Sequence, residues 1–196
     1  GKIIMKSPHE IQLAPNGNGA LFDSIKNNKM VAKLIGSVKY VQVIGVDNVL
    51  NLVLDPVQVG FMAEKQLEAT LKVCVKCDAA EKVGVVCKKN GLYDIVEYSE
   101  LSEEESTKTA ADGSLFLELG SILIFMLSAE KLLNLSSNTE TLNKLYHVAH
   151  KKLEHWNEAE NKTVKPEKEN GYKFELFLHN FLPFVGDGKF GAIKVV

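Results

Sequence analysis

A glycine-rich turn and an acid further along the chain are the features of this sequence most suited to chemistry. The turn is Ala14-Pro15-Asn16-Gly17-Asn18-Gly19, which opens into a helical pattern, and the acid is Asp47, directly after an apolar, β-branched segment. Glycine lets a backbone approach a ligand closely, asparagine offers donors and an acceptor, and a carboxylate suits Mg²⁺. Because ligands bind outside the carboxyl ends of strands in open α/β sheets, these two elements could flank one nucleotide or nucleotide-sugar pocket.

Two other groupings have the spacing of metal or redox sites. Cys74-Val75-Lys76-Cys77 has the interval of such a pair, but a strand there would point residues three apart to opposite faces. No fourth ligand is evident, so packed cysteines are favoured. His147 and His150 lie three apart on a predicted helix. No acid or cysteine completes a site with them, so a surface helix is favoured over a metal centre.

The composition is that of an ordinary globular domain. The chain has 196 residues, a formal net charge of −2, 45% hydrophobic and 24% charged residues, which allow one sizeable core and provide no field for nucleic acid. All 23 basic residues are lysine, so no guanidinium is available to bind a phosphate in a bidentate manner. No apolar run reaches the length of a membrane span and no signal peptide opens the chain. Together with the three cysteines, this predicts a cytoplasmic protein in a reducing compartment.

Helices and strands alternate along the chain, with one hairpin inserted. Apolar periodicity and capping signals predict helices over 21–35, 56–66, 128–135 and 139–152. Val, Ile and Tyr content predicts strands over 39–46, 70–76, 83–88, 93–98 and 190–196. Asp55-Pro56 is a helix start, Asn90-Gly91 a hairpin turn and Ser102-x-x-Glu105 a capping box, while 157–171 is predicted as a polar surface excursion. This order predicts an α/β domain with a mixed sheet.

Short motifs along nearly the whole chain resemble, in their order and spacing, the eukaryotic UDP-N-acetylglucosamine (UDP-N-acetylhexosamine) pyrophosphorylases. The motifs are Ala14–Gly19, Val46–Leu50, Asp55-Pro56 with Gly60-Phe61, Val83–Cys87, Val96–Glu100, His147–Ala149, Lys165-Pro166 and Asn170–Lys173. The Val96–Glu100 pentapeptide and the pairing of Asp47 with Asp55-Pro56 favour the N-acetylhexosamine branch over the UTP–glucose branch.

The resemblance implies an α/β fold, namely a Rossmann-like (GT-A-like) nucleotidyltransferase domain with a mixed β-sheet. Residues 1–196 would form a single partial catalytic domain, truncated at both ends, without the family's N-terminal phosphate loop and C-terminal domain. The implied activity is the transfer of uridylate from UTP to N-acetylglucosamine 1-phosphate with Mg²⁺ as cofactor, which yields UDP-N-acetylglucosamine and pyrophosphate. We expect that activity of the parent protein and little turnover from this chain alone.

The resemblance also implies roles for particular residues. Asp47 matches the metal-binding aspartate, and Lys173 matches a lysine that contacts the UTP phosphates; these two are the predicted catalytic residues. The predicted substrate-binding residues line the uridine and sugar, and they are Gly17, Asn18, Gly45, Gly84, Glu97, Tyr98 and Ser121. Structural alternatives remain for several of them: a plain turn at Gly17, a strand-end turn at Asp47 and a solvated acid at Glu97. Asp55 is assigned to helix capping alone.

The sequence departs from the family pattern around Gly120. The family has Asn-x-Gly-Asn-Ile there with a histidine a few positions later, whereas this chain has Ser121 in place of the second amide and Phe125 in place of the histidine. A hydroxyl is shorter than an amide and offers a single donor. Two alternatives therefore stay open: a catalytically degenerate nucleotide-sugar-binding paralogue, and a uridylyltransferase that uses a different sugar 1-phosphate.

Overall fold

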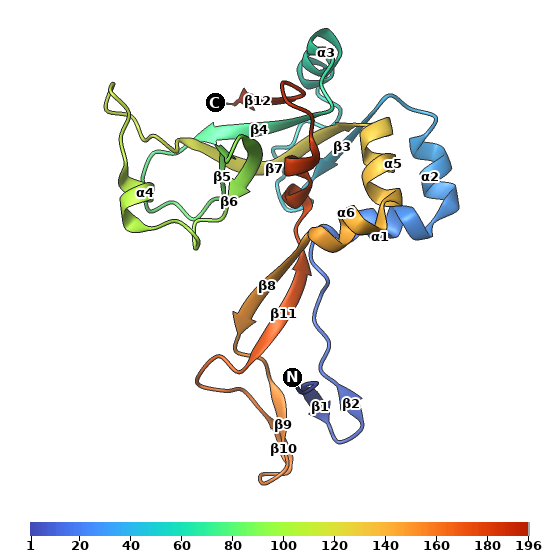
Figure 1. Cartoon of the computed structure of the whole chain (residues 1–196), viewed down its shortest axis with the longest axis vertical. Coiled ribbons are helices and arrows are strands. Elements are labelled where there is room, and N and C mark those ends of the chain that lie inside the picture. Colours follow the sequence, from blue (N-terminus) through green and yellow to red (C-terminus); the bar gives the residue numbers. More distant parts are fainter. Residues whose placement is uncertain (196) are drawn as a thin grey trace.

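A six-stranded mixed sheet forms the centre of an α/β body in the computed structural model, which describes residues 1–195 (Figure 1). The strand order is β12-β4-β7-β5-β6, and β3 also pairs with β7. The strands are β3 (Tyr40–Ile44), β4 (Ala69–Val75), β5 (Val85–Lys89), β6 (Leu92–Val96), β7 (Leu119–Ser128) and β12 (Phe190–Lys194). Only β12 and β4 pair in parallel among these neighbours. The predicted α/β class with a mixed sheet is confirmed.

Strand β7 is the hub of the sheet. One of its edges pairs with β4 along most of its length, while the other edge is shared by two strands. On that shared edge β3 ends at Ile44 opposite Ile124, and β5 begins at Val85 opposite Gly120. The register therefore leaves residues 121–123 of β7 between the carboxyl end of β3 and the start of β5, which brings two distant parts of the sequence to one place.

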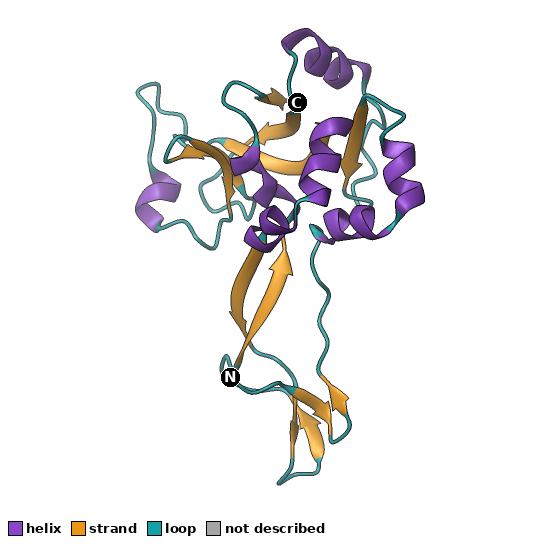
Figure 2. Cartoon of the chain, turned by 45° about the vertical axis from the view of Figure 1, so that its right-hand side comes forward, coloured by secondary structure: helices purple, strands orange, loops and turns teal. Residues whose placement is uncertain are grey.

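Helices cover both faces of this sheet (Figure 2). The helices of the body are α1 (Ala20–Asn27), α2 (Lys29–Ile35), α3 (Pro56–Lys65), α4 (Glu103–Thr107), α5 (Ala129–Ser137), α6 (Thr139–Lys144) and the 3₁₀ helix η1 (Leu178–Phe184). Side chains of α1, α5 and η1 join Phe125 of β7 in the larger core, while Met62 of α3 packs with Met126 in a smaller one. Because successive strand residues point to opposite faces, Phe125 and Met126 mark the two covered sides.

Two helix predictions are wrong in extent. The helix predicted over 21–35 is broken at Asn28, whose side chain accepts hydrogen bonds from the N–H groups of Met30 and Val31 and so caps α2. The helix predicted over 139–152 ends at Lys144, and residues 146–151 form β8 instead. Pairing with a distant strand outweighs the local helical pattern there. His147 and His150 therefore lie on a strand and not on a helix.

The strand β8 (Tyr146–Lys151) pairs with β11 (Gly171–Leu176) in a ribbon that projects away from the body (Figure 1). Two hairpins lie at its far end, formed by β1 (Met5–Ser7) with β2 (Glu10–Ile11) and by β9 (His155–Asn157) with β10 (Lys162–Val164). The Thr163 hydroxyl donates to the Lys6 carbonyl at 2.7 Å and joins the two hairpins. The polar segment predicted over 157–171 contributes β10 to this extension.

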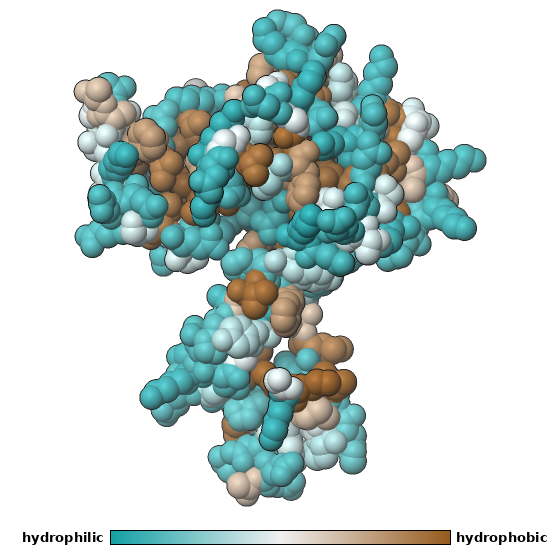
Figure 3. Space-filling model, viewed as in Figure 1, coloured by the Kyte–Doolittle hydropathy of each residue, from teal (hydrophilic) through white to brown (hydrophobic). Residues whose placement is uncertain are grey.

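Exposed apolar side chains on the extension face solvent. Ile3, Leu13, Tyr172 and Phe174 are all more than half exposed. Figure 3 shows apolar residues gathered among hydrophilic ones on this part of the surface. The extension therefore has little core of its own, and most of the buried apolar area lies in the α/β body.

The local capping and turn predictions are confirmed. Asp55 caps α3 by accepting from the Val57 N–H at 2.9 Å, and Ser102 and Glu105 form the capping box of α4. Asp55 also forms a buried ion pair with Lys72 of β4 at 2.5 Å, and the hydrogen bond from Lys72 holds the Asp55 pKa below its usual range. Asp55 is thus engaged structurally, as predicted, because it ties the start of α3 to the central sheet.

The cysteines remain free thiols, and the packed-cysteine prediction holds for Cys74, which is partly buried, but is wrong for Cys77. Cys77 lies beyond the end of β4 and is exposed. Within residues 1–195, no group of three or more His, Cys, Asp and Glu side chains is placed to hold a metal ion. No helix in that range is long and apolar enough to cross a membrane.

Candidate functional site

Gly45 and Asp47 follow the carboxyl end of β3. A Cβ added at Gly45 would lie 2.9 Å from the Asp47 Oδ1 atom and 3.4 Å from Leu123 Cδ2, so the missing side chain lets the loop turn beside β7. The Asn51 amide donates to the Gly45 carbonyl at 2.9 Å and anchors that loop. Asp47 is exposed, and no side chain in the described range pairs with its carboxylate. The acid is therefore available to a ligand.

Gly84, Glu97 and Ser121 lie together where β5, β6 and β7 meet. The Ser121 N–H donates to the Gly84 carbonyl at 2.8 Å. A Cβ added at Gly84 would lie 3.4 Å from Glu97 Oε1 and 2.7 Å from Ile95 Cγ2. Three of the residues predicted to line the uridine and sugar therefore share one wall, which continues along β7 to Leu123 and the loop of Gly45. Leu123 itself has a positive φ of 56°, which marks the irregular backbone of β7 in this stretch.

The glycine-rich turn packs against the junction of β11 and η1. The Leu176 N–H donates to the Asn16 carbonyl at 2.7 Å, and the Gly19 N–H donates to the Leu176 carbonyl at 2.8 Å. The Asn18 side-chain oxygen accepts from the Leu178 N–H at 2.8 Å. That contact uses the Asn18 oxygen for structure and leaves its NH₂ group as a donor. The turn is thus a structural clamp as well as a candidate ligand contact.

His179 and Phe177 connect the turn to the wall, and sequence reasoning missed both. His179 is buried, with Nε2 3.8 Å from Glu97 Oε1. The Phe177 ring stacks on both His179 and His147, with centroid distances of 5.3 and 4.9 Å. His147 lies within a motif of the family resemblance, but no local pattern distinguishes His179 within its apolar segment. Glu97 therefore lies near two imidazole rings, which Phe177 joins to each other.

The electrostatics of this wall favour a neutral, hydrogen-bonding ligand group. Burial raises the pKa of the Glu97 carboxyl, and the Glu100 carboxylate raises it further, while His147 acts in the opposite direction. Burial lowers the pKa of His179 to about 4, so its ring is neutral near pH 7. A carboxyl group beside a neutral imidazole can accept hydrogen bonds from hydroxyl groups, which is the pattern that a sugar presents.

Lys173 lies on the ribbon and is not in contact with Asp47. Its Nζ atom is 2.6 Å from Glu175 Oε1, and both side chains are mostly buried. The strand register places Glu175 opposite His147, and His147 Nδ1 is 3.8 Å from Glu100. Lys173 therefore lies on the same face of the ribbon as Glu175 and His147. It is about 10 Å along the strand from Leu176, where the ribbon meets the body.

Tyr98 directly follows Glu97 in the turn closed by the hydrogen bond from the Glu100 N–H to the Glu97 carbonyl, at 2.9 Å. Its side chain is 45% exposed. Tyr98 is therefore beside the wall by its position in the chain. Of the predicted residues, Gly84, Glu97 and Ser121 are joined by direct contacts, Gly17 and Asn18 are joined to them through η1, and Lys173 lies on the ribbon, paired with Glu175.

Comparison with known proteins bears on the origin of this arrangement. Residues 2–195 match the protein family described as UTP–glucose-1-phosphate uridylyltransferase. The chain is 35% identical over 193 residues to the UDP-N-acetylglucosamine pyrophosphorylase of Saccharomyces cerevisiae, covering 98% of this chain and 40% of that protein. It is 36% identical over 197 residues to the UDP-N-acetylhexosamine pyrophosphorylase-like protein 1 of Homo sapiens, covering 100% of this chain and 38% of that protein. The chain thus spans about two fifths of the length of these relatives.

A solved structure shows the same fold. The UDP-N-acetylglucosamine pyrophosphorylase of Trypanosoma brucei, determined in complex with an inhibitor, superposes with a TM-score of 0.83 at 26% identity. The alignment covers 100% of this chain and 39% of that one. The UDP-glucose pyrophosphorylase of Leishmania major, in complex with UDP-glucose, has a TM-score of 0.67 at 16% identity, a level that supports the shared fold alone.

Proposed function

The chain belongs to the UTP–glucose-1-phosphate uridylyltransferase family, and from this premise we propose that its parent protein transfers uridylate from UTP to N-acetylglucosamine 1-phosphate. The observation that carries the proposal is the wall formed by Gly84, Glu97 and Ser121 beside the turn of Gly17 and Asn18. In this reaction a phosphate oxygen of the sugar phosphate attacks the α-phosphorus of UTP in line. The new P–O bond forms as the bond to the β-phosphate breaks, and pyrophosphate leaves. Positioning and charge neutralisation suffice for such a transfer, without a covalent enzyme intermediate.

Asp47 is suited to hold Mg²⁺ together with the substrate phosphates. Mg²⁺ in such sites is bound through one or two carboxylates plus phosphate oxygens, and Asp47 offers one exposed carboxylate beyond the carboxyl end of β3. When bound, the ion would neutralise charge on the phosphates of the transferring group. A dedicated cage of protein ligands is not needed for this role, which agrees with a lone acid at this edge of the sheet.

Lys173 and Glu97 would act on different parts of the substrates. Lys173 would bring a point charge to the UTP phosphates, and this requires that its Nζ atom exchange the Glu175 carboxylate for phosphate oxygens. Glu97 would accept hydrogen bonds from sugar hydroxyls at the wall. Gly45 and Gly84 would leave room for the ligand, since side chains there would occupy the space next to Asp47 and Glu97.

Calorimetric titration of the chain with UDP-N-acetylglucosamine and with UDP-glucose, both with Mg²⁺, tests the proposal. We expect tighter binding of UDP-N-acetylglucosamine and at least a tenfold loss, about 1.4 kcal/mol, in Glu97→Gln. Glu64→Gln is the matched control, because the Glu64 side chain is 74% exposed on α3, and it should leave the affinity unchanged. Equal affinity in Glu97→Gln and the unchanged chain would contradict the role of the wall.

Ser121 gives a specific reason to keep a second candidate function, namely a nucleotide-sugar-binding paralogue without catalysis. Its N–H is engaged with Gly84, and its hydroxyl stands where the family pattern has an amide. The two candidates separate in a pyrophosphate-release assay of the full-length parent protein. Mg²⁺-dependent release that is abolished by Asp47→Ala supports the transferase. Absence of release in both the unchanged protein and Ser121→Asn supports the paralogue.

A further inference from the structure

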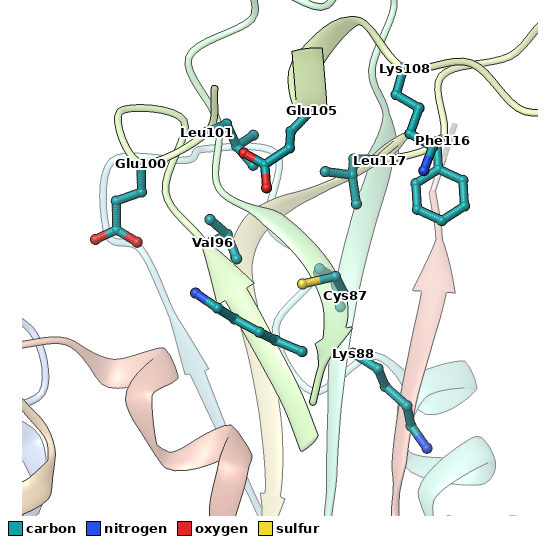
Figure 4. Close-up of a pocket in the computed structure, with 11 residues that line it drawn as sticks. Cys87, Lys88, Val96, Glu100, Leu101, Glu105, Lys108, Phe116 and Leu117 are labelled. Atoms are coloured by element: carbon teal, nitrogen blue, oxygen red, sulfur yellow. The ribbon is translucent and has the colours of Figure 1, made fainter. Parts of the chain in front are cut away.

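A second hollow lies on the far side of the β5–β6 hairpin from the candidate site. It has a volume of about 570 Å³, within the range of small-molecule sites. One wall is the hairpin and the other is the segment that carries α4 and leads to β7 (Figure 4). Its apolar lining comes from Val96, Leu101, Phe116 and Leu117. Phe116 is 58% exposed, so part of its ring is open to solvent at the edge of this hollow.

The strand register separates this hollow from the candidate site. Val85 pairs with Val96 and Cys87 with Asp94, so Cys87 and Val96 lie on one face of the hairpin. Ile95 is buried in the main core and therefore lies on the opposite face, as does Glu97, two residues further along the chain. The hollow and the wall are thus back to back, with the hairpin between them.

The charged groups around the hollow leave Lys108 for an anion, because Lys89 lies close enough to Glu105 to add to the lowering of that carboxyl's pKa by the Ser102 hydrogen bonds. Lys108 Nζ lies 4.6 Å from the centre of the Phe116 ring, and Lys108 has no ion-pair partner within residues 1–195. The two acids at the rim are otherwise engaged. Glu105 accepts from the Ser102 N–H and hydroxyl at 2.9 and 2.7 Å, and Glu100 faces His147.

Lys88 does not contribute to this positive charge. Its Nζ atom pairs with Asp187 at 2.9 Å and lies over the Tyr93 ring. Figure 4 shows it pointing away from the other labelled side chains. The cationic end of the hollow is therefore defined by Lys108, whose Nζ atom lies over the Phe116 ring.

We propose that this hollow is a second binding site, for a small amphipathic anion. The flat apolar body of such a ligand would lie against Leu101, Phe116 and Leu117, and its carboxylate, sulfonate or phosphate group would pair with Lys108. An apolar wall with one convergent cation is the arrangement that recognises this chemistry. The site is independent of uridylyl transfer, because none of these residues belongs to the proposed transferase machinery.

The test uses 8-anilinonaphthalene-1-sulfonate, an aromatic sulfonate, and follows alkylation of Cys87 by mass spectrometry. Cys87 lines the hollow, and Cys77 is exposed elsewhere on the surface. In one sample, Cys87 therefore reports whether the probe occupies the hollow, and Cys77 serves as the internal control. We expect the probe to slow Cys87 alkylation at least fivefold and to leave Cys77 unchanged. Leu101→Trp, which fills the hollow, should abolish this protection.

Lys108→Gln tests the anionic half of the proposal at an exposed position, where the fold tolerates the change. It should raise the probe concentration needed for protection about tenfold, whereas Lys33→Gln, an exposed lysine on α2, should have no effect. The proposal is overturned if the probe protects both thiols equally. It is also overturned if protection of Cys87 persists unchanged in Lys108→Gln.

Discussion

At the scale of single residues, His179 is the most informative side chain that the sequence did not reveal. It is 8% exposed, stacks on Phe177 and faces Glu97. The main cause of its lowered pKa is burial, which disfavours the charged ring; Asp94 acts in the opposite direction, and His147 adds a small lowering. A neutral ring at this position adds no positive charge to the wall and leaves Glu97 available to hydroxyl groups.

The shift of the His179 pKa predicts a pH dependence of stability. The pKa falls from 6.5 to about 4 on folding, so the unfolded chain takes up the proton first as the pH drops. The neutral His179 ring therefore contributes its full stabilisation above pH 6.5, and this contribution is lost as the pH falls to 4. The resulting change in the free energy of unfolding is about 3 kcal/mol. Urea unfolding measures the drop in the free energy of unfolding between pH 7 and pH 4. This drop should be smaller by about 3 kcal/mol in His179→Phe than in the unchanged chain.

A second histidine provides the control for that measurement. His150 is on the ribbon with a side chain that is 44% exposed, and His150→Gln should keep the full pH dependence. Identical pH dependence in His179→Phe and the unchanged chain would show that the buried ring does not titrate as described.

At the scale of elements, the glycine-rich turn holds α1 against the end of β11. Gly17 has φ of +86°, and a Cβ there would collide with the backbone carbonyl of Leu176. The hydrogen bonds of Asn16 and Gly19 to Leu176 come from the same contact. The turn therefore fixes the ribbon to the body, and its glycine is required by packing as well as by backbone conformation.

A comparison of Gly17→Ala with Gly113→Ala separates the effect of packing against Leu176 from the effect of the positive φ. Gly113 has nearly the same φ, +85°, but an added Cβ would meet no atom within 4 Å. Strained backbone of this kind costs about 1–3 kcal/mol, so both variants should lose stability in urea unfolding. Gly17→Ala should lose clearly more, because the Leu176 backbone must also move. Equal losses would mean that the turn and β11 are not clamped together.

At the scale of the whole molecule, three aromatic rings join elements that are distant in sequence. Phe125 of β7 packs edge-to-face with Phe181 of η1 at 5.7 Å, and Phe181 packs with Phe22 of α1 at 6.2 Å. All three are fully buried. The family resemblance led us to expect a histidine at the position of Phe125, and in this chain that position belongs to the core.

Truncation of Phe125 should therefore destabilise the whole molecule. Phe125→Ala removes a buried ring and leaves a cavity, with an expected loss of about 3–5 kcal/mol in the free energy of unfolding. Phe174→Ala is the control, since that ring is 60% exposed on the ribbon and its loss should change stability by less than about 1 kcal/mol. Similar losses in the two variants, measured by urea unfolding, would contradict this description of the core.

Features that depend on a few neighbouring residues were predictable. The cap at Asp55, the capping box at Ser102 and the turn at Asn90-Gly91 are all present, because each is set by hydrogen bonds or backbone freedom within four residues. The alternation of helices and strands predicted the α/β class for the same reason. The family resemblance, which the comparisons confirm, rests on the linear order of such short motifs.

Features that depend on distant partners were decided only by the tertiary structure. Residues 146–151 became a strand because β11 lies beside them, and no periodicity within that segment contains this information. The contact of Ser121 with Gly84 and the approach of His179 to Glu97 likewise join parts of the chain that are far apart in sequence. The sequence by itself determined the family, the class of fold and the candidate residues. Their grouping into a wall, with Lys173 set apart on the ribbon, follows from long-range strand register and packing.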